Sequence, residues 1–469
     1  MQKNKYTRLI KDILIFIVGN VLTKVVQFLL MPLYTTYMTT EAYGVAELTN
    51  NVSLLLYPIV TLCIYEAAFR YVVGSKYTRE EIITASIKVV FLSALAGAVV
   101  LVLSNTFIHY EYANSLYFIL YAFSFRTLMA YYVRGKGHTK VFAASGIINA
   151  VFLALFSYLF LVVLKLDVWG YLMGIGISYI CSALFLFIGG GLYKELNFSI
   201  YTKAITKDLL HYSMPLVIYN IGYWLTTMSG RYILLWFADV STAGIYAAVI
   251  KIAAIISMLE QAFYAAFQLN ASREYESKDK EAYYSSIFRL YAVGIIILGS
   301  VILCMSPLLA KFTLRNEFYA ARIYLPLVLF IAIIDCLFCF YKTMYTAYKL
   351  TSRTVPSMFI GSVINIVVGV LTVRQFGIWG ICFASFLCYS SQALYRIIDV
   401  RKFVNLKVEW KVIIPYLLLL GIQVLLLSTY ELVNILIAIA LAIFIFASLF
   451  GPAVKTIFKS QKDFFEQSP

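Results

Sequence analysis

The chain has 469 residues, of which 62% are hydrophobic and only 13% are charged, and its formal net charge is +15. Soluble domains are roughly half apolar and a quarter charged, so this composition excludes a soluble protein. The positive charge does not indicate nucleic acid as a partner, because the Lys and Arg residues lie singly or in small groups, without a continuous basic face. Membrane topology and anionic lipid headgroups explain the charge better.

Long apolar stretches predict an all-α polytopic membrane protein with about 14 transmembrane helices, at about 20 residues per crossing. The first stretch follows a basic start and has no small-residue cleavage site, so we interpret it as a retained span. No loop has room for a soluble catalytic domain, and we expect neither enzyme activity nor catalytic residues. The predicted spans cover residues 9–31, 45–69, 83–104, 114–133, 140–164, 168–191, 210–237, 244–269, 286–310, 322–348, 355–373, 377–399, 412–429 and 432–453.

Lys and Arg crowd into every second gap between these spans. About 27 of the 38 basic residues fall on one side of the predicted membrane and about 5 on the other. Cytoplasmic loops carry the excess of basic residues, so both termini are predicted to lie in the cytoplasm.

A few recurring residues indicate that the chain repeats itself with a period of six spans. Trp169-Gly170 recurs as Trp379-Gly380, and Asn20 and Gly44 recur as Asn220 and Gly244. An even number of spans keeps the orientation, so the halves are predicted to be related by an axis along the membrane normal. The predicted parts are a six-helix lobe (1–191), a cytoplasmic linker (192–209), a second six-helix lobe (210–400), two additional transmembrane helices (401–453) and a cytoplasmic tail (454–469).

Five cations fall inside predicted spans: Lys24, Arg126, Arg231, Lys251 and Lys342. Each costs about 2.5 to 3.5 kcal/mol or more at the centre of a span, so such residues usually face a bundle interior or a water-filled cavity. Helical spacing puts Asn20 on the face of Lys24, and Asn220 on the face of Arg231. We interpret the set as a cationic lining for an anionic substrate; the alternative for any one of them is a snorkelling or ion-paired structural charge.

Three acidic residues inside spans, Asp335, Glu47 and Glu66, are candidates for ion coupling. A carboxylate within a membrane can relay protons or bind a cation, and it can equally neutralise a neighbouring cation. Aromatic residues on or near the helix faces of Lys24 and Arg231 also have two interpretations, because they can stack on sugar rings or pack against other side chains. These aromatic residues are Tyr57, Tyr219, Tyr223 and Trp224.

Cofactor and metal motifs are not apparent. The seven cysteines lie scattered in apolar spans, and Cys336-x-x-Cys339 is better explained as packing than as a redox pair. The three histidines sit near span ends, far from forming a metal cluster, and no Gly-rich phosphate loop indicates ATP. We therefore expect no cofactor and no bound metal.

Several segments resemble the bacterial polysaccharide exporters, the O-antigen-type flippases (Wzx-like) of the multidrug/oligosaccharidyl-lipid/polysaccharide superfamily. The resemblance rests on FLLMPLYTTYMTTEAYGVAELTN (28–50), YPIVTLCIYEAAFRYV (57–72), HYSMPLVIYNIGYWLTTMSGRYILLWFADVSTAGIYAAVIKI (211–252) and AFQLNASREY (266–275). Related chains often have an Asp before the Arg of the seventh span, where this chain has Gly230.

This resemblance implies two six-helix lobes in a V around a central cavity. It implies ion-coupled, alternating-access transfer of undecaprenyl-diphosphate-linked oligosaccharide across the bacterial cell (inner) membrane for O-antigen, capsule or exopolysaccharide synthesis. The implied partners are the lipid-linked oligosaccharide, membrane lipids, a polysaccharide polymerase and chain-length machinery. We expect a monomer. Two alternatives stay open, a cation-coupled small-molecule or drug exporter of the same superfamily and a flippase for the peptidoglycan lipid precursor.

Overall fold

The computed structural model describes residues 25–74, 77–107, 109–197, 199, 203–274, 280–348 and 350–466, and the regular elements in them are all helices. Their contacts divide the chain into two compact units, Met1–Ala247 and Ala248–Pro469, with the boundary inside α10. The first unit contains α2 (Met31–Tyr37), α3 (Thr40–Val60), α4 (Ile64–Gly74), α5 (Arg79–Phe107), α6 (Ala113–Gly135), α7 (Thr139–Tyr158), η1 (Leu159–Val163), α8 (Asp167–Gly189), η2 (Leu192–Lys194), α9 (Lys203–Phe237) and the start of α10 (Val240–Glu274). The second unit continues with α11 (Lys280–Cys304), α12 (Ser306–Thr313), η4 (Asn316–Tyr324), α13 (Leu325–Ala347), η5 (Thr351–Arg353), α14 (Thr354–Phe376), α15 (Ile378–Val400), α16 (Trp410–Ser428) and α17 (Leu432–Glu466).

The prediction of an all-α polytopic membrane protein is confirmed. Among the described residues, 11 helices are long and apolar enough to cross a membrane, or 12 if the bent pair α3–α4 is one span. The seventh predicted span, 210–237, lies in the 35-residue helix α9, which is not among those 11. Most of the first predicted span, 9–31, lies outside the described residues.

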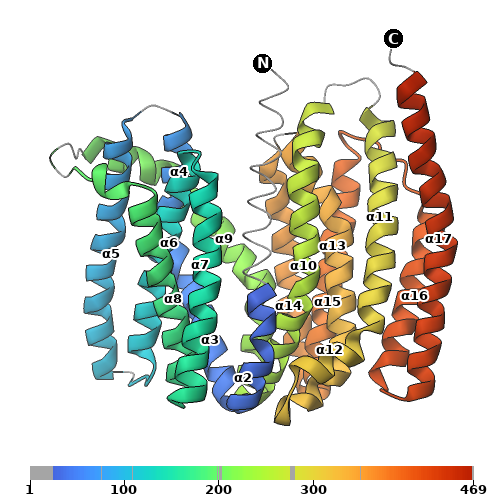
Figure 1. Cartoon of the computed structure of the whole chain (residues 1–469), viewed down its shortest axis with the longest axis horizontal. Helices are drawn as coiled ribbons and strands as arrows, with labels where there is room; N and C mark the ends of the chain where they lie inside the picture. Colours follow the sequence, from blue (N-terminus) through green and yellow to red (C-terminus); the bar gives the residue numbers. More distant parts are fainter. Residues whose placement is uncertain are drawn as a thin grey trace. The chain divides into compact units, whose positions relative to one another are not determined.

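Helix α6 lies at the centre of the first unit, where it contacts α3, α4, α5 and α8, while α7 packs on α8 and α9 packs on α3 and α4 (Figure 1). By contrast, α5 leaves most of its apolar side chains uncovered, such as Val99 and Val102, which are 60% and 65% exposed. A helix that exposes such residues in a membrane protein faces lipid tails, so α5 forms part of the lipid-facing surface of this unit.

The second predicted span, 45–69, is broken in the structure instead of continuous. Helices α3 and α4 meet at a 55° bend, and Leu62 and Cys63 between them adopt positive φ angles of 51° and 53°. Pro58 lies inside α3 before the break, where it leaves the preceding turn without one backbone hydrogen bond. Thr61 and Cys63 are buried, so protein and not lipid surrounds the irregular backbone, as a membrane requires.

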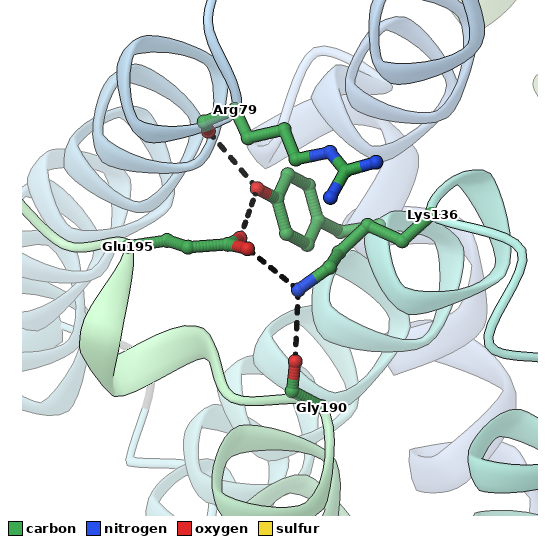
Figure 2. A network of polar contacts seen from close by, with 5 residues as sticks. Arg79, Lys136, Gly190 and Glu195 are labelled. Carbon is green, nitrogen blue, oxygen red and sulfur yellow. Dashed lines mark hydrogen bonds and ion pairs between the residues drawn. The ribbon is translucent and has the colours of Figure 1, made fainter.

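A polar network joins the ends of α6 and α8 to the start of α5 (Figure 2). The Lys136 ammonium donates to Glu195 Oε1 at 2.7 Å and to the Gly190 carbonyl at 2.9 Å. The Tyr132 hydroxyl lies 2.6 Å from Glu195 Oε2 and 2.9 Å from the Arg79 carbonyl. The Lys136 side chain is only 4% exposed, so a cation that the sequence places in a loop is a buried structural group.

The second unit is built around the antiparallel pair α14–α15, with α13 packed on α15 and α11 packed on α13, α16 and α17. The duplicated Trp-Gly motif makes equivalent contacts in the two units. The Trp169 ring lies 5.5 Å from that of Tyr112, and the Trp379 ring lies 5.1 Å from that of Tyr324. Both tryptophans lie in the first turn of their helix, α8 or α15, which supports a common origin for these helix pairs.

Candidate functional site

The candidate site in the first unit begins with α9, which is anchored along α3 by two aromatic residues. The Trp224 indole N–H donates to the Asn51 carbonyl at 3.0 Å, and the Tyr232 hydroxyl donates to the Leu48 carbonyl at 3.1 Å. The two rings also contact each other, with centroids 5.1 Å apart. These bonds fix the face of α9 that adjoins α3, and Arg231 lies between the two anchors in sequence.

The Arg231 guanidinium is buried, with 6% of the residue exposed, and it has few partners. Its Nη1 donates to the Met228 sulfur at 2.8 Å, and a thioether is a weak acceptor. Its Nε has no hydrogen-bond partner among the described residues, and no described carboxylate forms an ion pair with it. A buried donor normally has an acceptor, so Arg231 retains unused capacity to bind an anion.

Glu47 of α3 is a buried carboxylate, 4% exposed, enclosed by tyrosines. The Tyr171 hydroxyl of α8 donates to its Oε1, and the Tyr43 hydroxyl also hydrogen-bonds to it. The rings of Tyr34, Tyr43 and Tyr171 contact one another with centroids 4.8 to 6.2 Å apart. Helices α2, α3 and α8 thus form a tyrosine cage around one acidic group.

Arg126 of α6 is half-buried and held by α8. Its Nε donates to the Ser182 hydroxyl at 3.1 Å, and its guanidinium lies 5.7 Å from the centre of the Tyr179 ring. The Ser182 hydroxyl in turn donates to the Ser145 carbonyl of α7 at 2.9 Å. No described carboxylate forms an ion pair with Arg126, so this span cation also has only neutral partners in the part of the chain that is described.

Two tyrosines connect Glu47 electrostatically with these arginines. Tyr43 interacts with both Glu47 and Arg231, and Tyr179 interacts with both Glu47 and Arg126. Glu47 therefore shares one tyrosine neighbour with each arginine, Tyr43 on α3 with Arg231 and Tyr179 on α8 with Arg126.

Asn220 and Tyr57 lie at the break between α3 and α4. The Asn220 amide donates to the Leu216 carbonyl at 2.9 Å and contacts the Cys63 sulfur at 3.5 Å. The Tyr57 hydroxyl lies 3.3 Å from that of Tyr65, on the other side of the break. These polar side chains cover the irregular backbone from α9 and from α3.

Glu66 of α4 occupies a different environment from Glu47. It is half-buried, accepts a hydrogen bond from Tyr131 and interacts electrostatically with Arg134. The Arg134 guanidinium lies 5.1 Å from the centre of the Phe69 ring. Glu66 therefore has a cationic neighbour on α6 that compensates its charge.

The remaining predicted residues are divided between the second unit and the undescribed part of the chain. Lys251 on α10, and Asp335 and Lys342 on α13, are half-buried, and Asp335 interacts electrostatically with Cys388 of α15. Asn20 and Lys24 lie outside the described residues.

Sequence reasoning missed the tyrosine cage and Ser182. The aromatic residues that it selected differ in position: Trp224 and Tyr57 are partly buried at the site, whereas Tyr219 and Tyr223 are 37% and 54% exposed. Tyr171, Tyr179 and Ser182 recur along α8 at spacings of eight and three residues, which is the available signal for a polar face on that helix. In the described residues, no group of His, Cys, Asp and Glu has the arrangement of a metal site.

Two protein families match this chain. The family described as "polysaccharide biosynthesis protein" matches residues 9–267, which is more than half of the chain, and the family MatE matches residues 215–371. The chain belongs to the polysaccharide biosynthesis protein family. Among curated protein sequences, none matches it.

Solved structures show the same fold at low sequence identity. The lipid II flippase MurJ in an inward closed conformation has 11% identity and a TM-score of 0.64, over 95% of this chain and 100% of that one. A MATE multidrug resistance transporter of the MOP superfamily in its inward-facing conformation has 12% identity and a TM-score of 0.61, over 83% and 98%. A MOP superfamily transporter from Pyrococcus furiosus, described as having a binding pocket of reverse polarity, has 12% identity and a TM-score of 0.57, over 84% and 96%.

Proposed function

We propose that this protein is a flippase that moves undecaprenyl-diphosphate-linked oligosaccharide from the cytoplasmic to the outer leaflet of a bacterial cell membrane, for surface polysaccharide synthesis. The observation that carries the proposal is the state of Arg126 on α6 and Arg231 on α9, two guanidiniums that have no ion pair among the described residues. Membership of the polysaccharide biosynthesis protein family supports the sugar-linked nature of the cargo.

The diphosphate is the group that the arginines would bind. A guanidinium presents donors in a planar fork that matches phosphate oxygens, and its bonds to phosphate are charge-assisted. The Arg231 Nε already lacks an acceptor, so binding would supply an interaction that this buried group does not make with the described residues. Lys24, Lys251 and Lys342 complete the proposed cationic set, and Asn20 and Asn220 are proposed to bind polar groups of the cargo.

We assign ion coupling first to Glu47. Glu47 is buried and shares the neighbours Tyr43 and Tyr179 with Arg231 and Arg126, so its charge would oppose that of a diphosphate bound at these arginines. Protonation of Glu47 would then favour cargo binding, and cargo release would favour its ionised form. Glu66 is the weaker candidate because Arg134 already compensates it, and Asp335 is proposed as the corresponding acidic group of the second unit.

Depletion of the protein in its native cell tests the function. The experiment extracts lipid-linked oligosaccharides and determines the membrane face on which they accumulate. We expect complete repeat units on the cytoplasmic face and loss of surface polymer. Unchanged intermediates with normal surface polymer would exclude this cargo.

Two other functions have specific support. The MatE match over residues 215–371 and the buried carboxylate Glu47 favour a small-molecule exporter, because an acidic group binds cationic drugs. The resemblance in fold to the lipid II flippase favours a peptidoglycan-precursor flippase. The depletion experiment separates them, since accumulated peptidoglycan precursor would indicate the latter, and drug sensitivity with normal lipid intermediates would indicate the former.

A further inference from the structure

A further pocket lies within the second unit, and none of the described residues predicted for the cargo site lines it. It has a volume of about 510 Å³ and lies between α11 and α16, with α17 and the connection 401–409 completing its walls. That connection is tied to the start of α11, because the Asn405 backbone N–H donates to Glu281 at 3.2 Å and the Lys407 N–H donates to the Ser285 hydroxyl at 2.9 Å. These bonds fix the position of the mouth.

The mouth of the pocket is polar, and the charged residues of the lining are two cations and one carboxylate. Arg289 and Lys407 line it, together with the hydroxyl groups of Ser285 and Ser286. The single carboxylate, Glu409, accepts from Arg289 at 3.2 Å, and both side chains are about half exposed, 48% for Arg289 and 53% for Glu409. An exposed ion pair of this kind contributes little to stability, so its arginine can exchange partners readily.

The interior of the pocket is apolar. Phe288, Ile296, Val412, Ile413 and Leu449 line it. Ile296 lies seven residues beyond Arg289 on α11, about 10 Å along the helix axis. A hydrogen bond of 3.1 Å between Tyr416 and Ser448 joins α16 and α17 along the wall. A charged mouth above an apolar interior is complementary to an amphiphile, and a small soluble anion would leave these walls without a partner.

The position of the pocket mouth indicates that the amphiphile is a membrane lipid. The mouth lies at the ends of helices that the distribution of Lys and Arg assigns to the cytoplasmic surface, next to the exposed residues Arg401, Lys402 and Lys411. Basic pockets between transmembrane helices on this side bind anionic lipid headgroups. Two cations against one carboxylate favour an anionic headgroup over a zwitterionic one.

We propose that this pocket binds an anionic phospholipid, with its phosphate at Arg289 and Lys407 and one acyl chain between α11 and α16. The bound lipid joins the pair α16–α17 to α11 of the second unit. No described residue of the proposed cargo set lines this pocket, and we assign the bound lipid the role of a structural partner.

Native mass spectrometry of the purified full-length protein with phosphatidylglycerol, phosphatidylcholine or undecaprenyl phosphate tests the proposal. We expect selective retention of phosphatidylglycerol. Loss of each cation, Arg289→Gln or Lys407→Gln, should weaken its binding about five-fold, and the double variant about 25-fold. Glu409→Gln should strengthen binding, because it removes the carboxylate that competes for Arg289. Arg374→Gln, an exposed change elsewhere in the second unit, is the matched control and should leave binding unchanged.

A bulky side chain provides a second test that does not depend on charge. Val293→Trp should fill the interior and displace the lipid, whereas Leu298→Trp, on the same helix at a position 46% exposed, should not. Equal retention of phosphatidylcholine, preferential retention of undecaprenyl phosphate, or unchanged phosphatidylglycerol binding in the double charge variant would each overturn the proposal. The charge variants alter exposed side chains, so they keep the test valid even if Val293→Trp does not fold.

Discussion

Gly44 and Gly244 pack against each other at the start of α3 and the start of α10. A Cβ at Gly44 would overlap the Val240 carbonyl oxygen, and a Cβ at Gly244 would overlap the Thr40 carbonyl oxygen. Each glycine thus faces the carbonyl four residues before the other, and the Thr40 and Ser241 hydroxyls lie 2.5 Å apart beside them. The two glycines that the sequence pairs as repeat equivalents are therefore also neighbours in space.

A disulfide across this contact should stop transport. If export uses alternating access and this contact closes one end of the route, the starts of α3 and α10 separate in each cycle. The double variant Thr40→Cys/Ser241→Cys should cross-link on mild oxidation, lose export, and regain it with reductant, as measured by surface polymer or by transport in proteoliposomes. Each single cysteine variant is the control and should keep its export under oxidation. Full export by cross-linked protein would show that this contact stays closed during the cycle.

Removal of the Arg231 charge should separate function from stability. We expect Arg231→Met to lose most export while its melting temperature in detergent stays equal or rises, because an unpaired buried charge gives way to an apolar side chain of similar length. Arg134→Met removes a span-end cation that compensates Glu66 and should lower the melting temperature instead. Normal export by Arg231→Met would remove this residue from the cargo site.

Substitution of Glu47 should uncouple transport. Glu47→Gln keeps an oxygen that accepts from Tyr171 but cannot change charge, so the protein should fold and exchange cargo across a membrane without responding to an imposed ion gradient. Reconstituted vesicles with and without a gradient provide the measurement. Glu66→Gln should retain the gradient response. If both variants respond like the wild type, the coupling group lies elsewhere, with Asp335 the next candidate.

The Lys136–Glu195 ion pair should stabilise the folded protein. Glu195→Gln leaves an ammonium that is 4% exposed without its carboxylate, and we expect a loss of about 3–5 kcal/mol in the free energy of unfolding. The double variant Lys136→Met/Glu195→Leu should recover much of this loss, because it removes both charges together. Thermal or denaturant unfolding of the single and double variants measures these changes in stability. Additive losses in the double variant would contradict a direct coupling between Lys136 and Glu195.

The spans and the burial of Arg231 were accessible from the sequence because both follow from one physical constraint. Apolar length predicts a crossing, and a charge within it must avoid lipid; Arg231 on α9 is buried, and its role in a cationic lining stays a prediction. The tyrosine cage of Glu47 was not accessible, since Tyr34, Tyr43 and Tyr171 come from three helices whose neighbours only the tertiary structure determines. Tyrosines are also common at membrane interfaces, which conceals such a cluster.

The break in the second span was also missed. Pro58 alone is a weak signal, because prolines occur in transmembrane helices that remain continuous. Leu62 and Cys63 adopt positive φ angles although neither is a glycine, so the sequence does not indicate this backbone conformation. Contacts from Asn220 and Tyr65 help to stabilise this conformation, and they depend on residues distant from the break or beyond it.

The broken span of α3 and α4 has a consequence for how motion depends on the surrounding bilayer. Helices α3 and α4 can change the angle between them while the peptide groups at Thr61 and Cys63 in the connection remain enclosed by protein. Such a motion would keep the polar backbone groups of Thr61 and Cys63 away from lipid tails, where they would lack partners. The resistance to such motion comes from side chains that exchange neighbours around the connection, so its rate should depend on residues such as Asn220 and little on membrane thickness.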